Sequence, residues 1–245
     1  AVLAWQQVHV HSHERTGTPI PLELTFPWGA QYFWGSDREY LWCRSTWAPK
    51  VLGSGFMALE EWCIAELTRG RPVEELIEKI VEGNECIAIL GTAAMLTLYT
   101  EQLSETTIPL FTSQRLLAAD HHRMVGDLSS AARLIGFTKP SDKPHIEAVQ
   151  AADARLVRKS QLCWMVSKPF FEAEPIRDTV RNAILGFQDN LPFQYEEQCS
   201  NPEVQEDLAA QALEYSYLVD PNNYQAYRVE EDPSHVAMVH VSPSV

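Results

Sequence analysis

Glycine residues divide the stretch from Ser54 to about Leu103 into successive helix-length apolar patterns, and this division constrains the fold most strongly. Apolar residues recur at three- and four-residue steps in the first pattern (Phe56, Leu59, Trp62, Cys63 and Leu67). Gly70 stands where a left-handed helix stop is expected, Pro72 suits the first turn of the next helix, and Gly83 ends that helix. The order helix, glycine, helix, glycine predicts antiparallel helical hairpins.

Further helices are predicted along the rest of the chain. Their expected positions are 85 to 103 (apolar nearly all round and so sandwiched between neighbours), from Pro109, 122 to 135, 146 to 166, from Pro175, and from Asn201–Pro202 to about Tyr217. Stacked hairpins of this kind are typical of α-solenoids, but no fixed-period repeat is present. The predicted fold class is therefore mainly α, an irregular, α-solenoid-like array of antiparallel helical hairpins.

Extended segments flank the helical part. Residues 1–52 are expected to form an extended, aromatic-rich junction segment, and 221–245 a C-terminal extended segment with a pair of strands. Two prolines and polar residues in 139–144 predict a linker between a first helical array, 53–138, and a second, 145–220. The sequence opens directly on core-type residues without an initiator Met and stops without a tail, so we expect a piece cut from a longer protein.

Charge and cysteine content exclude several classes of function. The chain has 245 residues and a formal net charge of −14, which makes nucleic acid an unexpected partner. Its five cysteines are widely spaced with no CxxC pair, which favours reduced thiols in a cytoplasmic protein. The longest nearly apolar run, 86–99, is too short for a membrane span and predicts a buried helix. We therefore expect no membrane partner.

Alternating histidines near the start form the strongest candidate for chemistry. His9, His11 and His13 share one face of an expected strand, where neutral imidazoles could hold zinc. Three consecutive same-face ligands rarely reach one ion, and the sequence places no Asp or Cys partner for them. Exposed strand histidines without a metal are the favoured interpretation, and we expect no cofactor in this segment.

A second weak metal candidate is Asp120–His121–His122. This triplet resembles the metal-binding signature of DHH phosphoesterases, but it follows a helical rather than a strand-like pattern, and the aspartate-rich partner motifs are missing. Helix N-capping by Asp120 explains it more simply. Gly53–Ser54–Gly55 lacks the residues of a serine elbow or a phosphate loop, so Ser54 is expected to cap the first helix.

Aromatic residues are dense between Phe26 and Trp47, and so much aromatic area must be covered. The favoured interpretation is a junction on which another domain packs, and the alternative is a peptide-binding groove. The candidate interaction residues are Phe33, Trp34, Tyr40, Trp42 and Trp47. The groove hypothesis predicts that Trp34 and Trp42 are accessible to solvent.

The same region carries a resemblance to a known class of proteins. Its segments are Gln31–Gly35, Glu39–Arg44, Ala48–Pro49 and Met57–Trp62. They resemble the helical region that follows the nucleotide-binding module in large bacterial P-loop ATPases of antiphage defence, of the STAND or RADAR-ATPase type. The likeness covers about residues 26–120 and includes no catalytic motif. The ATP-site residues of that class lie upstream, so none is carried over.

Three functions of different classes follow. The favoured one is a non-catalytic scaffold or regulatory segment of such an ATPase, which binds other domains or subunits in a homo-oligomer or larger assembly and mediates assembly or partner sensing in antiviral defence. The first alternative is a metal-dependent hydrolase that uses the histidines of 9–13 with Asp120 and His121 or His122. The second is a free-standing helical adaptor that binds peptides.

Overall fold

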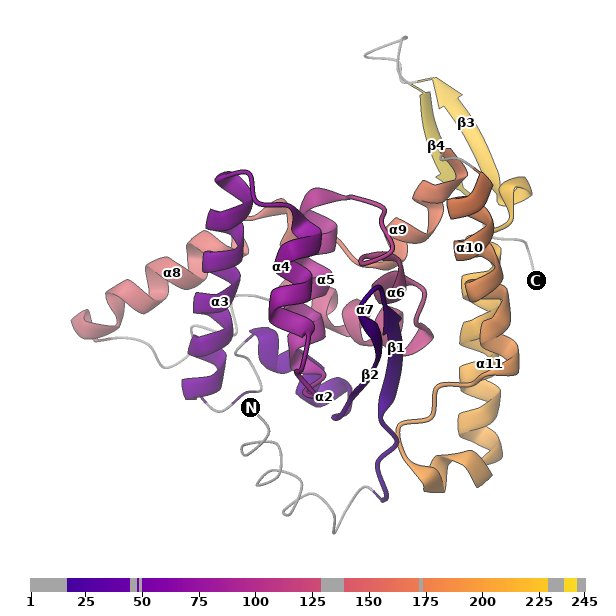
Figure 1. Ribbon diagram of the computed structural model, residues 1–245, viewed down its shortest axis with the longest axis horizontal. Coiled ribbons are helices and arrows are strands. Elements are labelled where there is room, and N and C mark those ends of the chain that lie inside the picture. Colours follow the sequence, from indigo (N-terminus) through magenta and orange to yellow (C-terminus); the bar gives the residue numbers. More distant parts are fainter. Residues whose placement is uncertain are drawn as a thin grey trace.

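A computed structural model describes residues 17–44, 48, 50–128, 139–171, 174–228 and 236–241. The protein is mainly helical, with one two-stranded antiparallel sheet near the N-terminus and another at the C-terminus (Figure 1). The fold class predicted from the helical patterns is confirmed.

The N-terminal sheet is a hairpin that leads into the first short helices. Strand β1 (Leu22–Phe26) pairs with β2 (Gly29–Phe33), and Phe26 and Phe33 lie in the core. Helix α2 (Asp37–Tyr40) begins with a capping box, in which Ser36 and Glu39 satisfy each other's backbone. The 3₁₀ helix η1 (Leu41–Arg44) follows and contacts the central helices.

Helices α3 (Lys50–Thr68) and α4 (Val73–Val81) pack against a central helix, α5 (Ala88–Thr100). Gly70 and Gly83, which follow α3 and α4, have φ angles of 87° and 73°. Both glycines therefore end their helices in the left-handed region, as predicted. Helix α5 is buried from its first residue to Leu98, so the prediction of a sandwiched helix is also confirmed.

Close packing of α5 on η1 depends on a glycine. A Cβ atom at Gly91 would overlap Cys43 Sγ and lie 3.0 Å from Cys43 Cβ. We expect Gly91→Ala to lower the free energy of unfolding by about 1–3 kcal/mol through overpacking, measured by urea denaturation. Gly55→Ala is the control, because a Cβ there meets nothing within 4 Å. It should raise stability by about 0.5–1 kcal/mol, as alanine favours helix; equal effects at both sites would contradict this packing.

Helix α3 begins earlier than the sequence predicted. Gly53, Ser54 and Gly55 all lie inside it, so the prediction that Ser54 caps the helix is wrong. Leu52 and Phe56 pack against buried Trp42. Burial of these side chains offsets the low helix propensity of the two glycines.

Helix α6 (Ile108–Phe111) carries Pro109 in its first turn, as expected, and α7 (Gln114–Leu128) follows it. The sequence placed a helix at 122–135 instead; residues 129–138 lie outside the described part. Ser113 Oγ accepts a hydrogen bond from Leu116 N at 3.4 Å, so the Ser113 side chain satisfies a backbone N–H in the first turn of α7.

The structure differs from the sequence prediction over 139–166, where a linker at 139–144 and one long helix at 146–166 were expected. A 3₁₀ turn, η3 (Pro140–Asp142), leads into α8 (Lys143–Asp153), where Pro144 lies in the first turn. The 3₁₀ helix η4 (Leu156–Lys159), helix α9 (Cys163–Ser167) and the 3₁₀ helix η5 (Lys168–Phe171) come next. The long helix stops because Arg155 turns to extended geometry, with ψ of 133°.

The C-terminal part is a helix pair followed by a projecting hairpin (Figure 1). The elements in order are α10 (Glu174–Leu185), the 3₁₀ helices η6 (Gly186–Asp189) and η7 (Glu196–Ser200), α11 (Pro202–Tyr217), η8 (Pro221–Asn223), β3 (Tyr224–Arg228) and β4 (Val236–His240). Asn201 caps α11 by accepting a hydrogen bond from Glu203 N. The N-cap and the two strands confirm the predictions for this part.

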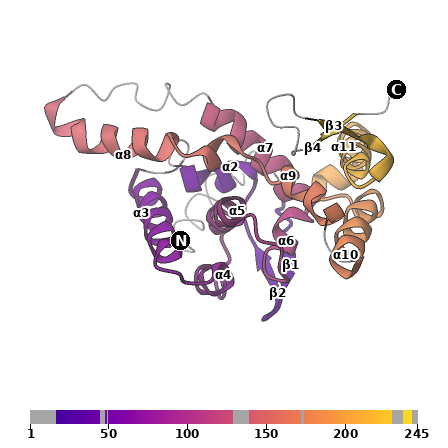
Figure 2. The ribbon, with the colours of Figure 1, turned by 90° about the horizontal axis from the view of Figure 1, so that it is seen from above.

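Side chains and backbone tie the C-terminal helices to the first part of the chain, beside α6 and α7 (Figure 2). Gln114 Nε2 donates to Leu208 O of α11 at 2.7 Å, and Ile20 N donates to Gln194 O at 2.9 Å. None of the described helices has the length and apolarity needed to cross a bilayer.

Candidate functional site

A cluster of charged side chains lies where η1, α3, α7 and η4 meet. Its members are Arg44, Glu60, Asp120, Arg123, Asp127, Arg155 and Arg158, and all except Arg155 are buried. Removing charges from water is costly unless each is paired and hydrogen-bonded. The pairing in this cluster therefore decides whether its members serve structure or chemistry.

Glu60 of α3 is the first centre of the cluster. Its Oε2 accepts a hydrogen bond from Arg44 Nη1 at 2.7 Å, and its Oε1 accepts one from Arg155 Nη1 at 3.0 Å. Arg158 Nη2 lies 2.7 Å from both oxygens. One carboxylate thus joins η1, α3 and the segment that follows α8.

Asp120 of α7 is the second centre. Its Oδ1 accepts hydrogen bonds from Arg123 Nε at 2.6 Å and from the Tyr40 hydroxyl at 3.0 Å. Its Oδ2 accepts from Arg123 Nη2 at 3.1 Å and from Leu162 N at 2.7 Å. Asp120 therefore fixes α2 and the start of α9 against α7, from the interior of the helix. The prediction that it caps the helix is wrong.

Asp127 connects the two centres. Its Oδ2 lies 2.9 Å from Arg123 Nη1 and 3.1 Å from Arg44 Nη2. Burial by itself would lower the pKa of Arg123, but Asp120, Tyr40 and Asp127 together more than compensate and hold that pKa above its ordinary value. The cluster is one continuous ion-pair network, called here the buried network.

The hydrogen bonds already made by the buried network limit the chemistry that it can carry out. Both oxygens of Glu60 and of Asp120 already accept hydrogen bonds from guanidinium, hydroxyl or backbone donors. A general base must reach the proton that it removes. The carboxylates of the buried network have no such freedom, because their oxygens already accept hydrogen bonds, and they instead hold segments of the chain together.

The predicted metal candidates are placed as follows. His9, His11 and His13 lie outside the described residues. His121 and His122 are exposed on α7; His121 Nδ1 is 2.9 Å from Gln161 Oε1, and His122 Nδ1 is 3.9 Å from Asp37 Oδ2. Among the described residues, no three histidine, cysteine or acidic side chains are grouped so that they could hold a metal ion.

The predicted interaction residues lie mostly inside this chain. Phe33, Tyr40 and Trp42 are buried, Trp34 is half-buried, and Trp47 is outside the described residues. The accessibility that the groove hypothesis requires of Trp42 is therefore contradicted. The reason is local packing: α2, which carries Tyr40, and η1, which carries Trp42, both pack on α5.

The cysteines are free thiols, and Cys43, Cys63 and Cys86 are buried. Burial raises the pKa of the Cys43 and Cys63 thiols to about 12. Thiols with such pKa values are protonated at neutral pH and are weak nucleophiles. These buried side chains contribute to the packing of the protein interior.

Arg115 of α7 is buried and contacts the backbone of the segment that precedes α2. Arg115 Nη1 donates to Ile20 O at 3.0 Å and its Nη2 donates to Gly35 O. Burial raises the pKa of nearby Asp37, although the attraction of Arg115 opposes the shift.

A carboxyl whose pKa is higher in the folded than in the unfolded chain makes the protein less stable as pH rises through the interval between the two pKa values. We therefore expect Asp37→Asn to be more stable than the wild type at pH 7, with the advantage vanishing below the unfolded pKa of 3.8. Urea denaturation at several pH values measures the difference. A pH-independent difference between the two proteins would contradict the burial of Asp37 as its cause.

Sequence reasoning missed the buried network, although one signal for it was present. Asp120, Arg123 and Asp127 follow each other at three- and four-residue steps. The same helix face carries Leu116, which is fully buried. Charged residues continuing an apolar helix face indicate a buried ion-pair cluster. The partners Glu60 and Arg158 come from distant segments and leave no local signal.

The sequence matches no protein-family profile, and no curated protein is similar to it at a significant level.

Proposed function

We propose that this chain is a non-catalytic helical scaffold or regulatory segment that mediates assembly or partner sensing. The observation that carries the proposal is the buried network, in which Glu60, Asp120 and Asp127 join η1, α3, α7 and η4. Charged groups that are engaged with one another thus link these four elements, which also share the apolar core. A segment whose helices are linked in this way can pass a displacement from one binding partner to another.

The nature of the parent protein rests on the resemblance in residues 26–120. We propose a large cytoplasmic bacterial P-loop ATPase of antiviral defence, in which this segment contacts other domains or subunits of a homo-oligomer or larger assembly. The proposal requires no cofactor in the segment itself. The free thiols are consistent with a reducing compartment.

The test compares the full-length parent chain with the same chain lacking residues 17–241. Mass photometry measures the assembly, and a phosphate-release assay measures nucleotide hydrolysis by the remaining domains. The scaffold proposal predicts that the deletion reduces the mass of the assembly. An assembly of unchanged stoichiometry would refute it, and absence of nucleotide hydrolysis in the parent would refute the ATPase assignment alone.

A further inference from the structure

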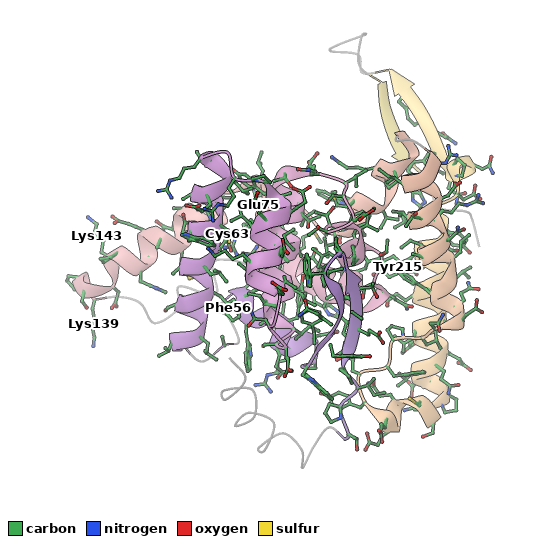
Figure 3. All side chains as sticks on the ribbon, in the orientation of Figure 1. Phe56, Cys63, Glu75, Lys139, Lys143 and Tyr215 are labelled. Atoms are coloured by element: carbon green, nitrogen blue, oxygen red, sulfur yellow. The ribbon has the colours of Figure 1, made fainter. Side chains whose placement is uncertain are left out.

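A cleft of about 490 Å³ lies between α3 and the α8–η4 segment. Small or flexible side chains line most of it, among them Ser54, Met57 and Ala58 from α3 and Ala148 from α8. In Figure 3 the labelled Lys143 marks the outer end of α8, beyond α3, which carries Phe56. The volume falls within the range of pockets for small organic ligands.

One end of the cleft is polar. Glu60, Glu61, Arg155 and Arg158 line it, so the cleft reaches the edge of the buried network. Arg158 is 3% exposed, and none of the described residues provides a hydrogen-bond partner for its Nε. A ligand in this cleft would meet apolar walls and an end that is lined by two guanidinium and two carboxylate groups.

The charges of the described residues do not balance within the buried network. Four guanidinium groups (Arg44, Arg123, Arg155 and Arg158) meet three buried carboxylates (Glu60, Asp120 and Asp127). The fourth carboxylate, Glu61, pairs with Arg155 but its side chain is 58% exposed. Among the described residues, Glu61 thus supplies the carboxylate that balances the fourth guanidinium, and it does so at Arg155, on the edge of the cleft.

An exposed ion pair such as Glu61–Arg155 is worth about 0–1 kcal/mol, so a bound anion can replace Glu61 at little cost. Arg155 is 21% exposed and can reach a ligand while Glu60 keeps it in place. A ligand carboxylate in place of Glu61 exchanges one negative charge on Arg155 for another, whereas a polyphosphate would bring several more negative charges beside Glu60.

We propose that this cleft binds a small organic carboxylate, with its apolar body between α3 and α8 and its carboxylate on Arg155 in place of Glu61. The ligand would join α8 to α3 and so stiffen the arm that α8 forms. This inference does not depend on the parent being an ATPase.

Isothermal titration calorimetry on the chain tests the proposal with three probes. Octanoate carries both features, octan-1-ol has only the apolar body, and acetate has only the charge. We expect octanoate to bind saturably at one site, and each of the other probes to bind at least about tenfold more weakly. Binding of octan-1-ol as tight as that of octanoate, or no saturable octanoate binding, would overturn the proposal.

Paired variants test the role of each residue. Arg155→Gln should weaken octanoate binding about tenfold, and Ala148→Leu should weaken it by filling the cleft, whereas Glu61→Gln should tighten it several-fold by removing the competing carboxylate. Arg69→Gln is the control, because Arg69 pairs with Glu66 and does not line the cleft. Circular dichroism confirms that each variant is folded. Unchanged affinity in Arg155→Gln and Glu61→Gln would overturn the assignment, whatever the result of the assembly experiment.

Discussion

Replacing Asp120 with alanine is expected to lower the free energy of unfolding by about 3–5 kcal/mol. The change leaves the guanidinium of Arg123, whose side chain is 1% exposed, without its closest carboxylate. It also removes the acceptor for the Tyr40 hydroxyl and for Leu162 N. Urea denaturation followed by circular dichroism measures the loss.

The neighbouring histidines provide the matched controls for Asp120. His121 and His122 are exposed on the same helix, so their replacement by alanine should change stability by no more than about 0.5 kcal/mol. The opposite order, with the histidines important for stability and Asp120 tolerant of change, would contradict the role of Asp120 in the buried network.

Replacing Glu60 with glutamine is the second change with a large expected effect, also about 3–5 kcal/mol. The amide keeps the size of the side chain but removes the charge that Arg44, Arg155 and Arg158 share. Glu61→Gln is the control, because it makes the same change at the next residue, which is exposed. It should cost less than about 1 kcal/mol.

Coupling between Glu60 and Arg158 distinguishes a paired charge from a merely tight fit. In the double variant Glu60→Gln/Arg158→Gln, the loss should be clearly smaller than the two single losses added together, because the second change removes a charge already left unpaired. Strict additivity would argue against a direct ion pair between these residues.

Local patterns in the sequence were sufficient for much of the fold. Gly70 and Gly83 mark helix ends because only a left-handed conformation closes those helices cheaply, and Asn201 followed by Pro202 starts α11 for equally local reasons. Prediction failed where tertiary packing decides. Burial of Leu52 and Phe56 draws α3 back through Gly53, and the ion pairs of Arg155 interrupt what looked like one long helix.

The site was less accessible to sequence reasoning than the fold. Asp120 was noticed for its neighbours His121 and His122, which point to solvent, whereas its partners Tyr40 and Arg123 determine its role. Tyr40 is 80 residues distant in the sequence. Pairing between remote segments depends on their arrangement in space, which residue periodicity does not encode.

We propose that the chain serves as a scaffold whose paired charged groups link its helices, and that it uses no catalytic metal. The most direct test is the thermal unfolding midpoint of the purified chain after EDTA treatment and after addition of Zn²⁺ or Mn²⁺, with the metal content measured on the same samples. We predict no stoichiometric metal and the same midpoint in every sample. A stoichiometric metal that raises the midpoint would contradict the account and support a metal-dependent hydrolase.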